Sequence, residues 1–449
     1  MTPDTFARYA DQRIPRYTSY PTAPHFSEAI DADTYQRWLS EVPEGALASL
    51  YLHVPFCRSM CWYCGCHTTI TKVDEPIVDY LGTLRTEIGL VGDALPRRLD
   101  VGHIHFGGGT PTILQPEEFE ALLALLRQRF ALRPEAEVAV EIDPRTLTRA
   151  MAATLGRIGV TRASLGVQSF DPVVQRAINR IQTFEQTAAV TRGLRAAGVG
   201  GINFDLIYGL PHQTETSCRT TVERCLELAP DRFAVFGYAH IPSFKPHQKK
   251  IDEAALPDAA ERAAQAEVIA DALIAAGYRR IGLDHFARGD DPMARAAEAG
   301  TLRRNFQGYT TDPCDLLLGF GASAIGRLPQ GYVQNAVVLG GYAKRIAAGS
   351  LATLKGYALS PDDRLRADVI ERVMCDFRVD LADVADRHGA DVSSLMRDAD
   401  LAPLEADGLI RRTGAVIEVP ETAWPLVRAV AARFDAHLPA SVRTHAPAV

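Results

Sequence analysis

The predicted fold depends on one stretch of sequence, Tyr51-Leu-His-Val-Pro-Phe-Cys57-Arg-Ser-Met-Cys61-Trp-Tyr-Cys64-Gly-Cys66. The apolar run 49–54 predicts a buried β-strand, and a C-x3-C-x2-C motif begins just beyond its end. In α/β folds, the loop that follows a strand is where ligands bind. Four of the eight cysteines fall within ten residues here, so the cluster requires a chemical explanation.

The thiolates in this loop predict an iron–sulfur cluster. Soft sulfur ligands select iron–sulfur clusters, zinc or Cu(I). A structural zinc site usually pairs two C-x2-C units or adds a spaced histidine pair, and neither follows downstream. Cys57, Cys61 and Cys64 leave one iron of a cubane without a protein ligand. Cys66 could close the cluster, but the single residue between it and Cys64 makes two corners hard to reach, which favours an open iron.

Outward from the loop, residues 50–238 alternate short apolar runs with amphipathic stretches, which is typical of βα units. Six strands joined by helices predict a parallel sheet with right-handed crossovers. We therefore expect an α/β fold with a partial (β/α)6 barrel whose ligand groups gather at the carboxyl ends of the strands. The predicted strands are 49–54, 102–106, 138–142, 162–166, 201–207 and 233–238.

The flanking segments predict a chain of four parts. Residues 1–47 form an amino-terminal arm over the active site, and prolines and aromatics near 14–21 exclude a continuous helix there. Residues 48–290 hold the barrel and an extension, and residues 291–359 form a Gly-rich connecting segment that completes the site. Residues 360–449 combine helix signals with a turn and a strand, which predicts a mainly helical, winged-helix-like accessory domain.

Composition and charge exclude several classes of protein. Hydrophobic residues make up 47% of the 449 residues and charged residues 23%, which is ordinary for a globular chain. The net charge of −7 predicts that the protein as a whole binds no nucleic acid. No apolar run approaches the roughly 18 to 20 residues of a membrane span, and no apolar signal core begins the chain. We expect a cytoplasmic protein and, by default, a monomer.

The remaining cysteines and several histidines predict core positions rather than ligands. The histidines at 53, 103 and 105 alternate along predicted strands, where satisfied strand histidines are commoner than metal ligands. The cysteines predicted to lie in the core are Cys218, Cys225, Cys314 and Cys375.

A glycine run after the second predicted strand completes a larger pattern. Gly107-Gly-Gly-Thr-Pro111 lacks side chains at the point where backbone would approach a ligand. Together with residues 51–64, this run resembles the radical S-adenosylmethionine (SAM) superfamily. The resemblance implies a [4Fe-4S] cluster held by Cys57, Cys61 and Cys64, with SAM chelated by the open iron. It also implies cleavage of SAM to methionine and a 5′-deoxyadenosyl radical.

Further motifs make the chain similar to the oxygen-independent coproporphyrinogen III oxidases, from about residue 8 to residue 435. Related haem chaperones share the cysteine loop, but typically have Asp-Phe in place of Gly65-Cys66 and lack the extended amino-terminal arm. Both differences favour the oxidases. The motifs are Arg16-Tyr-Thr-Ser-Tyr-Pro-Thr22, Cys64-Gly-Cys66, Gly166-Val-Gln-Ser-Phe170, Asn179-Arg-Ile-Gln182, Asp205-Leu-Ile-Tyr-Gly-Leu-Pro211, Tyr238-Ala-His240 and Asn305-Phe-Gln-Gly-Tyr-Thr-Thr311.

Polar residues at the predicted strand ends suit a charged nucleoside ligand. Carboxylate, amide and guanidinium groups at positions 141, 168, 180 and 205 are expected to converge on one face of the sheet. The resemblance places them at the SAM site and implies a second SAM beside the first. The matching positions are Tyr51, Tyr63, Cys66, Gly108, Gly109, Thr110, Glu141, Gln168, Arg180, Asp205, Ala239 and Ile325.

The resemblance also implies a reaction, in which two propionates of coproporphyrinogen III become vinyl groups and yield protoporphyrinogen IX for haem biosynthesis. Carboxylates approaching a protein of charge −7 need local cations, so we expect Arg16 to bind substrate, with Gln307 orienting it. We expect no catalytic residue beyond the cofactors, and a low-potential electron-donor protein as partner. The alternatives are a haem chaperone without oxidase activity and a zinc-stapled structural module.

Overall fold

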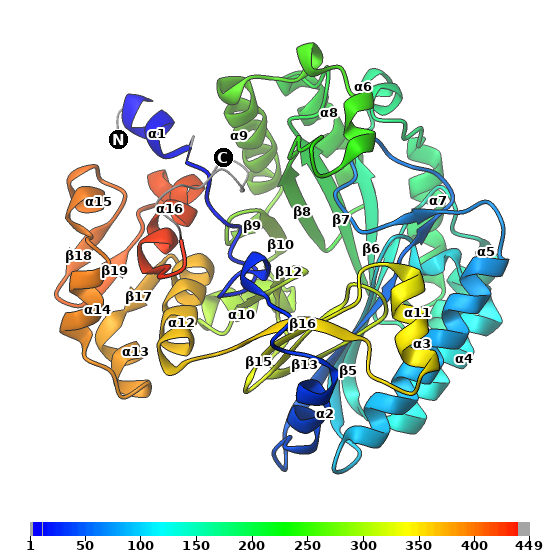
Figure 1. The fold of residues 1–449 in the computed structure, drawn as a ribbon. Coiled ribbons are helices and arrows are strands. Elements are labelled where there is room, and N and C mark those ends of the chain that lie inside the picture. Colours follow the sequence, from blue (N-terminus) through cyan, green and yellow to red (C-terminus); the bar gives the residue numbers. More distant parts are fainter. Residues whose placement is uncertain (1–2, 11, 439–449) are drawn as a thin grey trace. The chain divides into compact units, whose positions relative to one another are not determined.

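The computed structural model describes residues 3–10 and 12–438, which form two compact units (Figure 1). The larger unit comprises residues 26–272 and 312–358. The smaller unit comprises the described parts of residues 1–25, 273–311 and 359–449. Residues 1–2, 11 and 439–449 of the predicted arm and accessory domain lie outside the described residues.

One sheet organises the larger unit, with its strands in the order β16-β15-β14-β13-β1-β4-β5-β6-β7-β8. All neighbours from β1 to β8 are parallel, so the predicted α/β architecture is confirmed. The six predicted strands are observed as β1 Leu47–Val54, β4 Asp100–Gly108, β5 Ala131–Ile142, β6 Arg162–Gln168, β7 Gly201–Tyr208 and β8 Arg232–Gly237.

Amphipathic helices pack on this sheet because each buries an apolar stripe and begins at a capped residue. The helix α4, Pro116–Arg129, begins with a capping box between Gln115 and Glu118 and buries Phe119 on its apolar stripe. In Figure 1, helices α3, α4, α5 and α7 lie along one side of the unit. The other helices are α2 Ala32–Ser40, α3 Glu75–Ala94, α5 Arg149–Arg157, α6 Pro172–Ala177, α7 Phe184–Ala196, α8 Glu215–Leu226, α9 Ala259–Ala275 and α11 Leu339–Ala347.

The Gly-rich segment extends the sheet, which the sequence did not predict. Strand β13 pairs in parallel with β1 on the side away from β4, with Leu50 opposite Leu318. Three antiparallel strands then continue the sheet. These strands are β13 Leu316–Phe320, β14 Ile325–Leu328, β15 Gly331–Asn335 and β16 Thr353–Ala358. The cysteine loop has its own small parallel pair, β2 Phe56–Cys57 and β3 Thr69–Ile70.

A buried carboxylate on α3 joins this added segment to the rest of the unit. Glu87 Oε2 accepts hydrogen bonds from the Gly321 amide at 2.7 Å and from the Tyr342 hydroxyl at 2.8 Å. Its Oε1 accepts a third from Asn335 Nδ2 at 2.6 Å. Burial raises the pKa of Glu87 to about 7, although the three donors oppose that shift.

We expect the contribution of Glu87 to stability to decrease between pH 5 and pH 8. Its folded-state pKa of about 7 exceeds the ordinary value of 4.5, so in this range the folded chain retains a proton that the unfolded chain releases. The free energy of unfolding of the wild type, minus that of Glu87→Gln, should therefore fall by up to about 3 kcal/mol. Denaturant titrations at both pH values measure this difference, and a constant difference would contradict the assignment.

The smaller unit contains the expected mainly helical carboxy-terminal domain. The helix α12 begins at Ser360 with a capping box to Asp363, at the predicted cap. Helices α12, α13 and α14 accompany a three-stranded sheet in the order β17-β19-β18. Its elements are α1 Pro3–Ala10, β9 Tyr278–Ile281, β10 His285–Arg288, α10 Pro292–Glu298, β11 Arg303–Asn305, β12 Gly308–Thr310, α12 Pro361–Asp376, β17 Arg378–Asp380, α13 Leu381–Arg387, α14 Val392–Asp398, α15 Ala402–Ala406, β18 Arg411–Thr413, β19 Val416–Glu418 and α16 Val427–Ala431.

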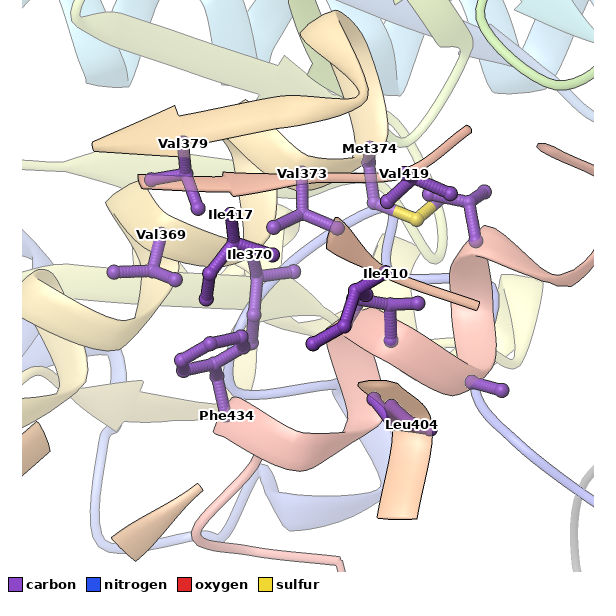
Figure 2. Close-up of a cluster of buried hydrophobic side chains, with 14 of the residues drawn as sticks. Val369, Ile370, Val373, Met374, Val379, Leu404, Ile410, Ile417, Val419 and Phe434 are labelled. Atoms are coloured by element: carbon purple, nitrogen blue, oxygen red, sulfur yellow. The ribbon is translucent and has the colours of Figure 1, made fainter. Parts of the chain in front are cut away.

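An apolar core holds the smaller unit together, with Val369, Val373 and Phe434 among its members (Figure 2). The amino-terminal arm contributes to this core through Tyr17, whose hydroxyl donates to Asp435 Oδ2 at 3.0 Å. Tyr9, Ile14, Tyr17 and Tyr20 of the arm therefore pack within the core of the smaller unit, whereas residues 26–47 belong to the larger unit. None of the described helices is long and apolar enough to cross a membrane.

Candidate active site

The cysteine loop lies directly after β1 and contacts the end of β4. Cys57 Sγ lies 3.2 Å from Thr110 Oγ1, and the Cys64 amide donates to the carbonyl of Cys61 at 3.1 Å. Cys61 is buried and Cys66 is exposed. A hydrogen bond from the Cys66 thiol lowers the pKa of Cys64 to about 6, and burial opposes the shift only in part. Cys64 is therefore the thiolate of that pair.

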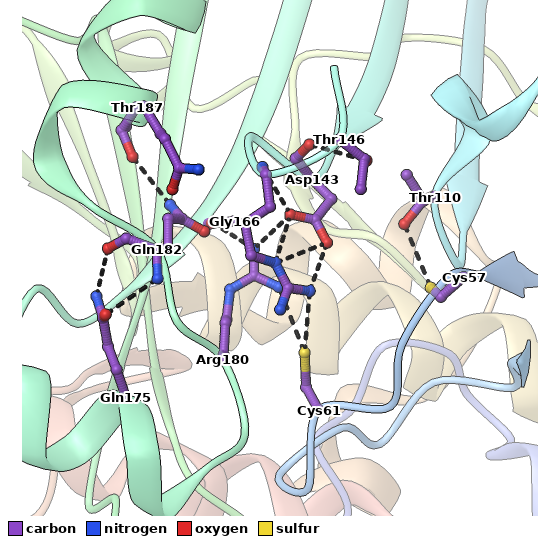
Figure 3. Close-up of polar contacts among 12 residues, drawn as sticks. Cys57, Cys61, Thr110, Asp143, Thr146, Gly166, Gln175, Arg180, Gln182 and Thr187 are labelled. Carbon is purple, nitrogen blue, oxygen red and sulfur yellow. Dashed lines mark hydrogen bonds and ion pairs between the residues drawn. The ribbon is translucent and has the colours of Figure 1, made fainter. Parts of the chain in front are cut away.

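Two guanidinium groups face Cys61 (Figure 3). Arg145 Nη2 donates to Cys61 Sγ at 3.3 Å, and Arg180 Nη1 donates to the same sulfur at 3.5 Å. Both arginines also pair with Asp143, at 2.6 Å and 3.4 Å. Burial opposes ionisation of Asp143, but the hydrogen bond from Arg145 and the charge of Arg180 hold its pKa below the usual value. Two cations against one carboxylate leave net positive charge beside this sulfur.

Two segments from other βα units hold the carbonyls of the cysteine loop. Asn179 Nδ2 donates to the carbonyl of Met60 at 2.8 Å. On the other side, His247 Nε2 donates to the carbonyl of Cys64 at 2.7 Å, and Lys245 Nζ to that of Cys66 at 3.0 Å. The loop backbone is thus fixed by side-chain donors that are far from it in sequence.

The glycine run permits a close approach between the end of β4 and the start of the cysteine loop. The Gly109 amide donates to the carbonyl of Val54 at 2.9 Å, and the Thr110 amide donates to that of Phe56 at 2.8 Å. A Cβ atom at Gly109 would lie 2.5 Å from the Phe56 carbonyl oxygen. Gly108 has a φ of +114°, which favours glycine. The run is therefore required sterically as well as being suited to a ligand.

Buried polar groups line the strand ends next to these glycines. Glu141 accepts a hydrogen bond from the Gly108 amide at 3.1 Å, and its other oxygen lies 3.1 Å from His105 Nε2. Burial opposes the ionisation of Glu141. Its pKa is nevertheless below the ordinary value, mainly because of the contact with His105. The Tyr51 hydroxyl lies 2.9 Å from His53 Nδ1.

The next two strands contribute a second carboxylate and an amide. Asp205 accepts hydrogen bonds from the Ser164 hydroxyl at 2.9 Å and from Asn203 Nδ2 at 2.8 Å. Burial raises the pKa of Asp205 to about 7, and the charge of Glu141 adds to the shift. Gln168 ends β6 in the left-handed region, with a φ of +67°. This strained backbone at a strand end is typical of functional sites.

All the residues predicted to bind the cluster and SAM belong to the larger unit. Tyr63 and Ala239 are joined through one side chain, because Gln248 Nε2 donates to both carbonyls, at 3.0 and 3.2 Å. Ile325 begins β14, in the segment that extends the sheet. Arg16 and Gln307 belong to the smaller unit, and their role in substrate binding stays a prediction.

Comparisons with known proteins agree with this geometry. The family description "Radical SAM superfamily" matches residues 51–225, and "HemN C-terminal domain" matches residues 359–426. The oxygen-independent coproporphyrinogen III oxidase of Bradyrhizobium diazoefficiens is 63% identical over 450 residues, covering 100% of both chains. The enzyme of the same name from Paracoccus denitrificans is 42% identical over 95% of both chains.

The chain belongs to the family of oxygen-independent coproporphyrinogen III oxidases. The solved structure of coproporphyrinogen III oxidase (HemN) from Escherichia coli, described as a radical SAM enzyme, matches with a TM-score of 0.90. It is 38% identical, and the match covers 95% of this chain and 100% of that one. The resemblance inferred from the motifs is confirmed, and the zinc-stapled module is excluded as the description of this chain.

Membership of this family implies a [4Fe-4S] cluster and SAM, and the residues of the loop fit them. Excess positive charge beside Cys61 suits an anionic iron–thiolate cluster. The Nε–H group of Arg180 is buried and has no partner among the described residues, as expected where a ligand completes the site. Among the described residues, no three His, Cys, Asp or Glu side chains lie close enough to hold a single metal ion. A cubane does not need such a group, because each cysteine binds a separate iron at its own corner.

Several residues of this site were not predicted from the sequence. Asp143 bridges Arg145 and Arg180 and does not cap the helix that follows it, since the residue that caps α5 is Thr148. The pattern Glu-Ile-Asp-Pro-Arg at a strand end was the available signal. His105 had been assigned to satisfied strand histidines, and its partner is the site carboxylate Glu141. Among the predicted core cysteines, Cys218, Cys225 and Cys375 are buried, whereas Cys314 is only partly so.

Proposed function

We propose that this protein converts coproporphyrinogen III to protoporphyrinogen IX without dioxygen, as a cytoplasmic monomer. The observation that carries the proposal is the cysteine loop held against two arginines and the glycine run, in a chain 63% identical along its whole length to an oxidase of that name. Two propionates of the substrate would each lose a hydrogen atom, CO2 and one electron, leaving a vinyl group. The electron would pass to an external acceptor.

In this proposal Cys57, Cys61 and Cys64 hold three irons of the cluster. When bound, the cluster and SAM supply a 5′-deoxyadenosyl radical that removes a hydrogen atom from the substrate. The protein's residues bind and orient these groups and keep water out of the site. The backbone of Gly108, Gly109 and Thr110 would contact the methionine part of SAM, because the two glycines themselves carry no side chain.

The polar residues at the strand ends would bind the rest of SAM. Glu141 is an ionised acceptor for ammonium or ribose hydroxyl groups, and Gln168 and Asp205 supply further polar contacts. Arg180 has an unsatisfied donor for a carboxylate. Tyr51 and Tyr63 would pack beside these groups. A second SAM would lie near Cys66, Ala239 and Ile325, so that two SAM molecules serve two decarboxylations.

Substrate carboxylates would bind residues of the smaller unit. Arg16 is exposed. The pKa of Asp284 is lowered mainly by His285, and the nearby charge of Arg16 lowers it further. Arg304 lies 4.4 Å above the Tyr309 ring and donates to the carbonyl of Arg16 at 3.3 Å. Gln307 lies in the turn between β11 and β12. Arg16 and Arg304 would offset the repulsion between a chain of net charge −7 and the propionates of the substrate.

SAM carries positive charge and should bind only the ionised form of Asp205. We therefore expect the affinity for SAM to rise about tenfold from pH 6 to pH 8. The pKa of Asp205, about 7, lies in this range, whereas that of Glu141 lies below it. The Asp205→Asn variant should bind SAM more weakly and lose this part of the pH dependence. Calorimetry on anaerobically reconstituted protein measures both, and an unchanged slope in the variant would refute the role of Asp205.

The test of the proposed function is anaerobic reconstitution with iron and sulfide, followed by mass analysis of products from SAM, coproporphyrinogen III and a reductant. We expect protoporphyrinogen IX, and 5′-deoxyadenosine that forms only when coproporphyrinogen III is present. Tight haem binding with no vinyl product would instead support a haem chaperone.

A further inference from the structure

Three segments of the larger unit surround the outer side of the cysteine loop. Residues 57–73 contain the cysteine loop and the segment that follows it. Arg58 joins the two parts by donating to the carbonyls of Thr71 and Val73, at 3.4 and 3.3 Å. Residues 172–184 contact it where the Trp62 amide donates to the carbonyl of Ile178 at 2.9 Å. Residues 241–251 contact it through Lys250, whose Nζ lies 5.8 Å from the centre of the Trp62 ring. We call these three segments together the loop face.

The loop face is basic in an acidic protein. The segments contain two, two and three Lys or Arg residues respectively and no Asp or Glu, and the acidic residues Asp74, Asp171, Glu185 and Asp252 lie directly beyond their ends. The whole chain has 48 Lys and Arg against 55 Asp and Glu. Arg180 is buried in the site, and Arg58 is paired with Asp74 just outside the first segment. Lys72, Lys249 and Lys250 are exposed and supply positive charge to solvent.

The loop face also carries exposed apolar side chains. Val73 is 60% exposed, Val173 45%, Ile181 59% and Phe244 68%. These are four of the seven strongly exposed large apolar side chains in the part of the chain that the structure describes. Exposed apolar side chains that occur together with charged residues are typical of a protein interface.

We propose that the loop face is the docking site for a small acidic electron-carrier protein, an inference that rests on the proposed function. The reaction requires an electron delivered to the cluster, and this face covers the cluster ligands. The exposed lysines of this face would steer an acidic carrier toward the loop, in a chain whose net charge of −7 would otherwise repel it. The contact would be small and short-lived, as electron-transfer encounters are.

The test compares two double variants with equal changes of charge. Lys72→Glu with Lys249→Glu alters the loop face, whereas Arg192→Glu with Lys344→Glu alters exposed cations outside it. The probe is a reduced plant-type ferredoxin. We expect the first variant to bind the ferredoxin at least about tenfold more weakly, and to be reduced correspondingly more slowly, with a flatter dependence on salt. The second variant should resemble the wild type.

Dithionite separates this inference from the proposed function. It is a small reductant that needs no docking face, so it should reduce the cluster and support 5′-deoxyadenosine formation equally in all three proteins. Failure of the wild type with dithionite would refute the proposed function. Normal dithionite activity, with equal ferredoxin affinity and equal reduction rates in the two variants, would overturn the docking site alone. Preferential binding of a nucleic acid to the loop face would overturn it too.

Discussion

The Cys61→Ser variant should fold but fail to retain its iron–sulfur cluster. The serine hydroxyl can still accept hydrogen bonds from Arg145 and Arg180, which now donate to the Cys61 sulfur, so the loop should keep its conformation. Iron is lost because an alcohol is a harder and far less acidic ligand than a thiol. We expect iron content and the visible absorbance of reconstituted protein to fall to background, and 5′-deoxyadenosine formation to fall with them.

The matched control is Cys66→Ser, in the same loop. Cys66 is exposed, and its thiol acts as hydrogen-bond donor to Cys64. If three thiolates hold the cluster, this variant keeps the iron content of the wild type, and its defect is confined to SAM binding. Equal loss of iron in both variants would mean that four thiolates close the cluster, and the proposed mode of SAM binding would then be wrong. Cys225→Ser, in the core of α8, reports any general effect of removing a cysteine.

The barrel strands were predictable because local patterns determine them. Most of the six central strands contain a short run rich in apolar residues, and burial on both faces leaves that pattern in the sequence. The strand β13 was missed because glycines interrupt its neighbourhood, and its pairing with β1 joins residues more than 260 positions apart. Such pairing leaves no periodic signal.

The site was predictable to the extent that spacing carries chemistry. The cysteine motif and the glycine run could be identified because each is contiguous in sequence. The surroundings of Cys61 could not be, because Arg145 and Arg180 reach it from two different loops and only the folded sheet brings them together. The hydrogen bond between Tyr17 and Asp435 could not be predicted for the same reason, since the two residues lie near opposite ends of the chain.

Replacing Gly109 by alanine should disrupt the site more than any other single methyl addition to the glycine run. The new Cβ would lie 2.5, 2.8 and 2.9 Å from backbone atoms of Phe56, which cannot move as a flexible side chain would. At Gly107 and Gly108 the nearest atoms belong to side chains. Relief of the clash would separate β4 from the cysteine loop and break the hydrogen bond from the Gly109 amide to Val54. We expect about 3 kcal/mol of destabilisation and loss of measurable SAM binding.

The control is Gly65→Ala, which adds the same methyl group inside the cysteine loop. No atom lies within 4 Å of a Cβ at Gly65, so the change in stability should stay within about 0.5 kcal/mol. Thermal unfolding of both variants before reconstitution, followed by SAM titration after it, separates the effect on the fold from the effect on the ligand. Normal SAM affinity in Gly109→Ala would show that the contact between β4 and the loop can widen without harm, and the glycine would then serve no role in shaping the site.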